Sequence, residues 1–261
     1  MTPTVHLDDD LDTPSTRAVL ASLPRSLKPG GNTGGIRAVS GDRPDWPERV
    51  RTALTPETRA VLVSEVTPAE PAAVRELADV ATVPVVLDSP WALNPATLGA
   101  AGQLRAAASA AAIIELFAVR DEAPAKTLLA QLALLRTAVG DVTDLRLDRL
   151  DAHGHLGFAR LGTVPVQLTG VRSTAGEEAR LVLRGAGEQW RLQFGDAALA
   201  RPAAVTRIDE HGEHLLPTVY ETALRAAWRH THAAAEGVTP PYTLRRLADD
   251  LSLLPAGALV R

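Results

Sequence analysis

The sequence predicts an α/β fold in two domains: a parallel sheet covered by helices over residues 1–120, and an α+β domain with an open, mostly antiparallel sheet over residues 121–261. In the first part, short apolar runs alternate with segments of helical periodicity, which is the pattern of successive βα units. The runs Ala60–Val63 and Val83–Leu87 are apolar without alternation, as expected of strands buried on both faces. After residue 120, strand-like segments follow one another without helices between them, which indicates an antiparallel sheet.

Local signals place each element. In the first domain we expect strands over residues 5–7, 35–40, 60–64, 83–87 and 110–119, and helices over 16–27, 46–54, 69–81 and 94–107. Pro68, Pro71 and Pro95 suit the starts of helices, where a missing amide costs little. In the second domain a long helix over 125–139 precedes strands over 142–150, 155–161, 164–171, 179–185, 189–194 and 204–208. Helices over 219–236 and 244–253 close the chain, the first ended by Gly237.

Composition excludes several classes of function. The net charge of −4 and the pI near 6.0 give no basic surface for nucleic acid. The chain contains no cysteine, so it has no disulfide, thiolate metal site or cysteine nucleophile. No apolar run is long enough to span a membrane, and residues 1–12 do not have the pattern of a secretory signal. We therefore expect a cytoplasmic protein with neither a nucleic-acid nor a membrane partner.

The order of elements and three short strings resemble the Gfo/Idh/MocA family of NAD(P)-dependent oxidoreductases. Arg59–Ser64 is similar to the fourth-strand region of that family, and Val83–Leu93 to the segment around its Glu-Lys-Pro motif. Leu216–Glu221 is similar to the start of its closing helix. The resemblance implies a Rossmann-like domain followed by an α+β domain, over most of the chain.

The first departure from the family lies in the turn after the first expected strand, where G-x-G-x-x-G lets backbone amides approach a pyrophosphate. Here the turn reads Asp8-Asp9-Asp10-Leu11-Asp12-Thr13-Pro14. Its four carboxylates repel a pyrophosphate, and it has no glycine. The glycine cluster at residues 30–35 follows the first helix, and we interpret it as a plain loop. We therefore expect no cofactor, with NADP in an atypical site as the alternative.

Two further departures concern the residues that would use the cofactor. Asp88-Ser89-Pro90-Trp91 aligns with Glu-Lys-Pro, so Ser89 stands in the position of the lysine that binds and polarises the substrate. The helix over 125–139 resembles the family helix with an Asp-x-x-x-His pair, and the alignment puts Lys126 at the aspartate and Ala130 at the histidine. The resemblance thus implies that the family's acid–base pair is missing.

Asp88, Ser89 and Lys126 are the candidate catalytic residues. Lys126 is one of two lysines, and it is either a relocated cation, base or Schiff-base amine, or a solvated residue at a helix start. His153 and His155 are two residues apart, but no third ligand accompanies them, so we expect a turn rather than a metal site.

The sequence predicts a Gfo/Idh/MocA-like protein that has lost NAD(P) binding and redox catalysis, and acts as a non-redox tailoring enzyme or as an accessory or scaffold protein in a biosynthetic pathway. The alternative is a functional NAD(P)-dependent oxidoreductase that reduces an imine or a carbonyl with an atypical cofactor site. We also expect the open face of the second sheet to pair with another copy or with a partner enzyme, and we leave open a small-molecule ligand.

Overall fold

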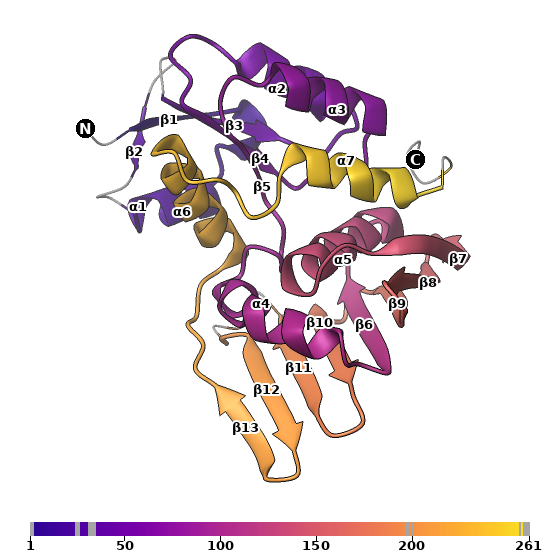
Figure 1. The fold of residues 1–261 in the computed structure, drawn as a ribbon. Helices are drawn as coiled ribbons and strands as arrows, with labels where there is room; N and C mark the ends of the chain where they lie inside the picture. Colours follow the sequence, from indigo (N-terminus) through magenta and orange to yellow (C-terminus); the bar gives the residue numbers. More distant parts are fainter. Residues whose placement is uncertain are drawn as a thin grey trace. The chain divides into compact units, whose positions relative to one another are not determined.

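The computed structural model describes residues 3–23, 27–30, 35–196, 199, 201–255 and 257 of the chain. Their contacts define two units, drawn in Figure 1. One unit combines Met1–Leu93 with Ala223–Ser252, and the other consists of Asn94–Thr222 with residues 253–258. The expected boundary near residue 120 therefore differs from the division in the structure, which falls at residue 93.

A sheet of five parallel strands forms the centre of the first unit. The strands are β1 (Thr4–Leu7), β2 (Lys28–Pro29), β3 (Ile36–Ser40), β4 (Ala60–Ser64) and β5 (Val85–Leu87). They lie in the order β2-β1-β3-β4-β5, and each neighbouring pair is parallel. Every residue of β4 is buried, as its unbroken apolar run predicted.

Helices cover both faces of this sheet. The short 3-10 helix η1 (Asp9–Leu11) leads from β1 into α1 (Pro14–Ala21), which Thr13 caps by accepting a hydrogen bond from the amide of Thr16. α2 (Trp46–Ala53) packs on β3, β4 and α3 (Pro71–Val80). α6 (Ala223–Ala235) packs on the opposite face of the sheet together with α1 (Figure 1). α7 (Leu244–Leu253) contacts α3 through a hydrogen bond that Arg245 donates to Asp79.

The closing helix α6 completes the core of the first unit. Trp228, Ala226 and Ala227 belong to one apolar cluster with residues of β1, β3, β4, β5 and α1. Trp228 is 1% exposed, so a large apolar surface leaves water when α6 docks. We expected both closing helices in the second domain. Instead, α6 belongs to the first unit, because it buries the part of the sheet face that α1 does not cover.

A sheet of eight strands dominates the second unit. It follows α4 (Pro95–Ala108) and contains β6 (Ile113–Arg120), β7 (Thr143–Asp151), β8 (Gly154–Leu161), β9 (Val164–Arg172), β10 (Glu178–Arg184), β11 (Gln189–Phe194), β12 (Ala204–Asp209) and β13 (Gly212–Leu216). The strand order is β13-β12-β11-β10-β6-β9-β8-β7. All pairs are antiparallel except β6 with β9. The predicted fold class, a parallel sheet domain and a mostly antiparallel one, is confirmed.

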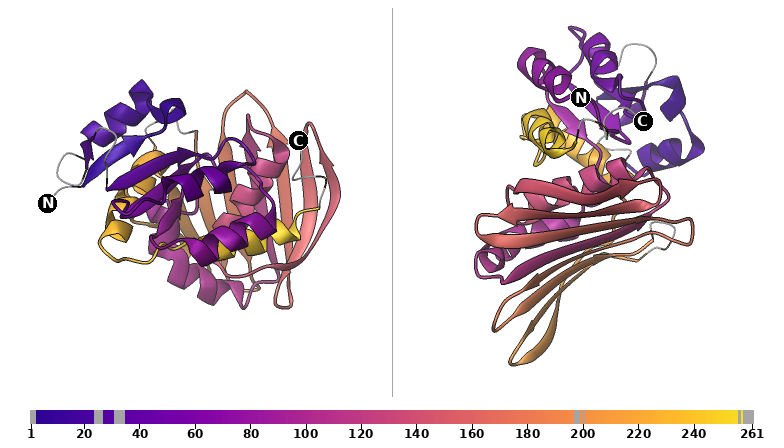
Figure 2. Two further views of the ribbon diagram at one scale, coloured as in Figure 1. Left: turned by 90° about the horizontal axis from the view of Figure 1, so that it is seen from above. Right: turned by 90° about the vertical axis from the view of Figure 1, so that its right-hand side faces the viewer.

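β6 corrects one expectation about the topology. We expected residues 110–119 to form the last strand of the parallel sheet, but β6 lies between β9 and β10 in the second sheet. Its residues alternate between buried and partly exposed, because α4 and α5 (Pro124–Ala138) cover only one face of this sheet. The open face is visible in the right-hand view of Figure 2. The sequence signal for this open face is Glu115, a charged residue in the middle of an otherwise apolar stretch of β6.

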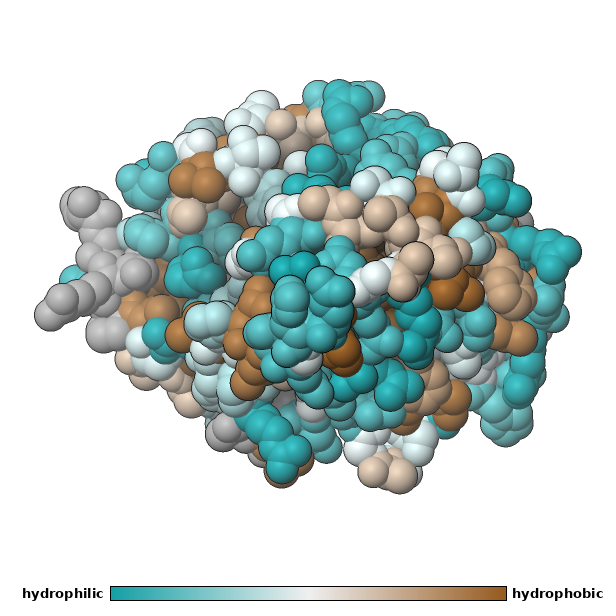
Figure 3. All heavy atoms as spheres, turned by 60° about the horizontal axis from the view of Figure 1, so that its bottom comes forward, coloured by the Kyte–Doolittle hydropathy of each residue, from teal (hydrophilic) through white to brown (hydrophobic). Residues whose placement is uncertain are grey.

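The side of the molecule seen in Figure 3 carries small apolar areas separated by hydrophilic residues. Within the described ranges, no helix is both long enough and apolar enough to cross a membrane.

Candidate functional site

The strand order of the first sheet places a ligand crevice between β1 and β3. The chain leaves β1 towards β2 on one side, and it leaves β3 towards β4 and β5 on the other. In open α/β sheets, ligands bind outside the carboxyl ends of two such neighbouring strands. Here Asp8 follows β1 and Ser40 ends β3, so their side chains mark this edge.

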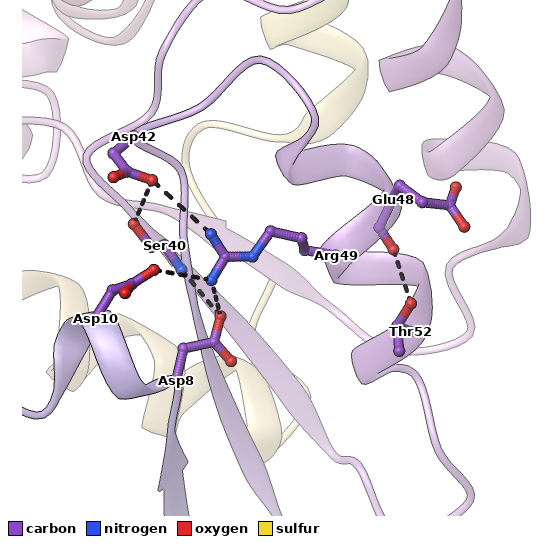
Figure 4. Close-up of polar contacts among 7 residues, drawn as sticks. All are labelled: Asp8, Asp10, Ser40, Asp42, Glu48, Arg49 and Thr52. Atoms are coloured by element: carbon purple, nitrogen blue, oxygen red, sulfur yellow. Dashed lines mark hydrogen bonds and ion pairs between the residues drawn. The ribbon is translucent and has the colours of Figure 1, made fainter.

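One arginine gathers three carboxylates at this edge. Nη2 of Arg49, on α2, lies 2.7 Å from Oδ2 of Asp8 and 3.4 Å from Oδ2 of Asp10 (Figure 4). Nη1 lies 3.8 Å from Oδ1 of Asp42. The amide of Ser40 donates to Asp8 at 3.4 Å, and its hydroxyl donates to Asp42 at 2.8 Å. Three carboxylates around one guanidinium leave an excess of negative charge at the edge.

A cavity of about 470 Å³ opens beside this cluster. It is lined by residues of β1, η1, β3 and α2, namely His6, Leu7, Asp8, Asp9, Asp10, Arg37, Arg49, Thr52 and Ala53. His6 and Arg37 are direct partners across β1 and β3. The cavity therefore joins the acidic edge to a wall that carries basic side chains.

The strand order places two turns at this crevice. The observed order 2-1-3-4-5 is that of flavodoxin-like sheets, whose switch point also lies between β1 and β3. The turn after β1, Asp8–Pro14, therefore borders the crevice, and it has no glycine. The second turn that borders the crevice follows β3 and reads Gly41-Asp42-Arg43-Pro44-Asp45.

This turn contains one glycine, and packing explains it. The amide of Gly41 donates to the carbonyl of Ser64 at 2.6 Å, and the carbonyl of Gly41 accepts from Thr67 at 2.8 Å. A Cβ on Gly41 would lie 2.7 Å from the same Ser64 oxygen. Pro47, in the first turn of α2, removes another amide donor. The amide of Gly41 is therefore already bonded within the fold, and Pro47 has none to offer a ligand.

The earlier glycine cluster gives no information on this point. Residues 31–34 of the cluster at 30–35 lie outside the described residues.

Asp88 and Ser89 lie on the same edge, but beyond β4. The amide of Asp88 donates to the Val63 carbonyl at 2.8 Å, and the hydroxyl of Ser64 donates to the Asp88 carboxylate at 3.4 Å. Ser89 is 5% exposed, and its hydroxyl oxygen accepts from the amide of Ala92 at 3.3 Å. Since β4 separates β5 from β3, these two residues do not join the Arg49 cluster.

Lys126 belongs to the second unit and is not a solvated residue. Its side chain is 12% exposed, and Nζ lies 3.2 Å from a carboxylate oxygen of Glu122, four residues earlier. Ala130, at the position the alignment gives to the family histidine, is buried on α5. The structure therefore does not describe one site that contains Asp88, Ser89 and Lys126 together.

His155 has a partner that the sequence interpretation missed. His153 lies in the turn between β7 and β8, whereas His155 lies on β8 and is 2% exposed. Nε2 of His155 is 2.7 Å from Oε1 of Gln131 on α5. Burial lowers the pKa of His155 to about 4. The sequence contains one signal for this partner: Gln131 is a polar residue among the leucines and alanines of the helix over 125–139. The described part of the chain contains no group of three or more histidine, aspartate or glutamate residues that could hold a metal.

Comparison with known proteins gives a fold and no sequence relative. No family model matches the chain, and no curated protein matches it. Solved structures do match along nearly the whole chain. An oxidoreductase from Sinorhizobium meliloti is 12% identical with a TM-score of 0.65, covering 100% of this chain and 97% of that one. UDP-N-acetylglucosamine 3-dehydrogenase from Acidithiobacillus ferrooxidans is 13% identical with a TM-score of 0.62, covering 97% and 95%.

A third match corrects the expectation about the cofactor. A 3-ketoreductase from Actinomadura kijaniata, solved in complex with NADP, is 12% identical with a TM-score of 0.64 and covers 97% of this chain and 96% of its own. A neighbour with this fold thus binds NADP, which overturns the expectation of no cofactor. The predicted resemblance is confirmed: the chain has the fold of the Gfo/Idh/MocA-type oxidoreductases.

Proposed function

We propose that the chain binds an NAD(P)-type dinucleotide at the carboxyl ends of β1 and β3 and acts as an oxidoreductase with an atypical cofactor site. The observation that carries this proposal is the cluster of Arg49 with Asp8, Asp10 and Asp42, which lies at the ligand crevice of the fold. The NADP complex of the 3-ketoreductase supports the class of ligand.

The residues at the edge would divide the binding between them. The carboxylate of Asp8 is proposed to accept hydrogen bonds from the ribose hydroxyls, because it follows β1 at the switch point between β1 and β3. The guanidinium of Arg49 is proposed to exchange its longer contacts with Asp10 and Asp42 for a phosphate when a nucleotide binds. When bound, the nicotinamide supplies hydride transfer at a carbon–oxygen or carbon–nitrogen bond.

Asp88 and Ser89 stay proposed catalytic residues of the first unit, and Lys126 stays a separate proposed catalytic residue of the second unit. The carboxylate of Asp88 follows β5 on the same edge and is the group proposed to exchange a proton with the substrate. Ser89 holds the turn after it through the amide of Ala92. Lys126, paired with Glu122, is proposed as a cation of the second unit that binds an anionic group.

Calorimetric titration with NAD⁺ and NADP⁺ tests the proposal. We expect at least one of them to bind, Asp8→Asn to weaken that binding about tenfold, and Arg49→Gln to weaken it at least as much. Arg17→Gln is the matched control, since Arg17 pairs with Asp12 and does not line the cavity. If neither nucleotide binds at millimolar concentration, the proposal is wrong. If a nucleotide binds but is never reduced or oxidised with any carbonyl, imine or alcohol tested, a non-redox tailoring role in a biosynthetic pathway takes its place.

A second candidate function, as a scaffold, rests on the open face of the second sheet. Phe158 and Val171 are 38% and 40% exposed there, and a cavity of about 210 Å³ beside them is lined by Phe117, Thr169 and six neighbours. A second copy of the chain is the proposed occupant, with a partner enzyme as the other outcome. Sedimentation of the wild type and of Phe158→Glu tests it. A monomer at every concentration would contradict self-association.

A further inference from the structure

The strand β13 forms one edge of the eight-stranded sheet (Figure 1). No strand in the described part of the chain pairs with its outer side. Residues 212–215 are all exposed, and Leu215 is 70% exposed. An unpaired edge offers its amides and carbonyls to any extended segment that approaches it. β13 is therefore a surface on which another strand can be added.

The other sheet edges carry features that prevent such pairing. In the first sheet, the edge strands β2 and β5 have only two and three residues. β7, the far edge of the second sheet, has two irregularities in its register with β8, and Asp144 within it has a φ of 55°. Arg146, Asp148 and Arg149 add charges along β7. Bulges and charges of this kind block edge pairing, whereas β13 keeps an unbroken register with β12 from residue 212 to residue 216.

The register of β13 shows which of its backbone groups point outwards. The loop between β12 and β13 has two residues, 210 and 211, so Asp209 and Gly212 form the hydrogen-bonded pair that closes the hairpin. Hydrogen-bonded and non-hydrogen-bonded pairs alternate along an antiparallel ladder. His214 therefore bonds to β12, while Glu213 and Leu215 belong to non-hydrogen-bonded pairs. The N–H and C=O groups of Glu213 and Leu215 thus point away from β12.

We propose that β13 pairs antiparallel with β13 of a second copy of the chain, about a two-fold axis at His214. Glu213 of each copy then exchanges backbone hydrogen bonds with the partner's Leu215, which satisfies the outward groups of both strands. The contact is isologous, so the same five residues supply both sides of it. It uses an edge of the sheet and not its open face, and it does not depend on nucleotide binding.

The side chains select this register over the neighbouring ones. Glu213 and Leu215 lie on the same face of β13, and the proposed axis puts each carboxylate opposite an apolar side chain. An axis at Glu213 would put two carboxylates opposite each other, which is unfavourable. An axis at Leu215 would pair Glu213 with the partner's Pro217, which has no N–H to donate. The edge is short, so we expect a weak dimer that forms at high protein concentration.

A single introduced cysteine tests the axis, because the chain has no cysteine of its own. At a non-hydrogen-bonded pair the two Cα atoms are about 4.5 Å apart, which a disulfide can span. We expect His214→Cys to form a covalent dimer on mild oxidation about tenfold faster than Glu210→Cys, because the dimer holds the two thiols together. Glu210 is the matched control, since it is exposed at the tip of the same hairpin and lies away from the axis. Circular dichroism of both variants checks that they fold.

A second pair of variants tests the backbone contact by sedimentation velocity. Leu215→Pro removes one outward amide from each copy and leaves the bonds between β13 and β12 in place, so it should weaken the dimer about tenfold or more. Leu215→Val keeps this amide and a branched apolar side chain, and it should associate like the wild type.

The outcomes separate this edge from the open face of the sheet. If His214→Cys forms no covalent dimer, or forms it no faster than Glu210→Cys, the proposal is wrong. If Phe158→Glu abolishes self-association and Leu215→Pro leaves it unchanged, copies of the chain meet at the open face and the edge contact is wrong. Titration with NAD⁺ and NADP⁺ tests the proposed function separately, because β13 contributes no residue to the cavity beside Arg49.

Discussion

Nε2 of His155 donates a hydrogen bond to Oε1 of Gln131, 2.7 Å away, between α5 and the eight-stranded sheet. The direction follows from the other bonds of the glutamine. Nε2 of Gln131 donates to the carbonyl of Thr169 at 2.9 Å and to that of Leu116 at 3.4 Å, which leaves its oxygen to face the imidazole. Both side chains are almost completely buried. One buried amide thus connects α5 to three neighbouring strands.

Removing the amide should destabilise the second unit. In Gln131→Leu the buried Nε2–H of His155 loses its acceptor, and the carbonyls of Thr169 and Leu116 lose a donor. We expect the free energy of unfolding to fall by about 2–4 kcal/mol, measured by urea denaturation. Gln103→Leu, the same substitution at an exposed position of α4, is the control and should change little. Equal effects of the two substitutions would contradict a role for the buried amide.

The burial of His155 against Gln131 should make the free energy of unfolding depend on pH. Burial lowers the pKa of His155 to about 4, from 6.5 in the unfolded chain, while the nearby carbonyl of Pro124 acts in the opposite and smaller sense. As the pH falls below 6.5, the unfolded chain takes up a proton that the folded protein refuses. The folded state should therefore lose about 3 kcal/mol between pH 6.5 and pH 4.

Comparison with a variant isolates this contribution from that of the carboxylates. Urea denaturation of His155→Gln over the same pH range gives the dependence without the imidazole. We expect a shallower decline than in the wild type. Parallel curves for the two proteins would show that His155 does not titrate in this way.

The missing side chain of Gly170 leaves room for the imidazole ring of His155. The two residues are direct partners across β8 and β9, and a Cβ built on Gly170 would lie 2.1 Å from Cε1 of the imidazole. Gly170→Ala should therefore cost about 1–3 kcal/mol or more, because the overpacked ring cannot move within a buried site. Gly187→Ala, where nothing lies within 4 Å, should be tolerated. The double variant with His155→Ala should lose less stability than the sum of the two single variants.

Docking of α6 should determine the stability of the first unit. Trp228 is 1% exposed within the apolar cluster of that unit, so Trp228→Ala should lower its free energy of unfolding by about 3–5 kcal/mol. Val80→Ala removes an apolar side chain that is 55% exposed on α3, and it should have little effect. Urea denaturation followed by circular dichroism measures both. A small effect of Trp228→Ala would indicate that the first sheet is stable without the helix.

Much of the secondary structure could be predicted because its signals are local. β4 and β11 occupy the predicted residues 60–64 and 189–194, and α7 occupies the predicted residues 244–253. Three patterns indicate how one segment is buried: an unbroken apolar run, an alternation with period two, and an apolar helical stripe. Each can be recognised within the segment, without knowing which other elements pack against it. Short edge strands lack such signals, and the prediction missed both β2 and β13.

The candidate site could be predicted only in part. The acidic turn after β1 was noticed in the sequence, but its partner Arg49 was not, because 41 residues separate Arg49 from Asp8. Ser89 and Asp88 were correctly identified as residues that follow a buried strand, although β4 separates them from the Arg49 cluster. Gln131 was missed because its role depends on hydrogen bonds to the carbonyls of Leu116 and Thr169. These residues belong to β6 and β9, two strands that α5 covers.

The sequence by itself determined which segments are apolar strands, where proline starts a helix, and that no cysteine chemistry exists in this chain. Only the tertiary structure decided which strands are neighbours. Strand order depends on how crossover connections bury apolar faces between segments far apart in the chain, and no local pattern records it. That order put β3 rather than β1 beside β4, brought α6 back to the first sheet, and placed Arg49 against Asp8 at the edge where a nucleotide is proposed to bind.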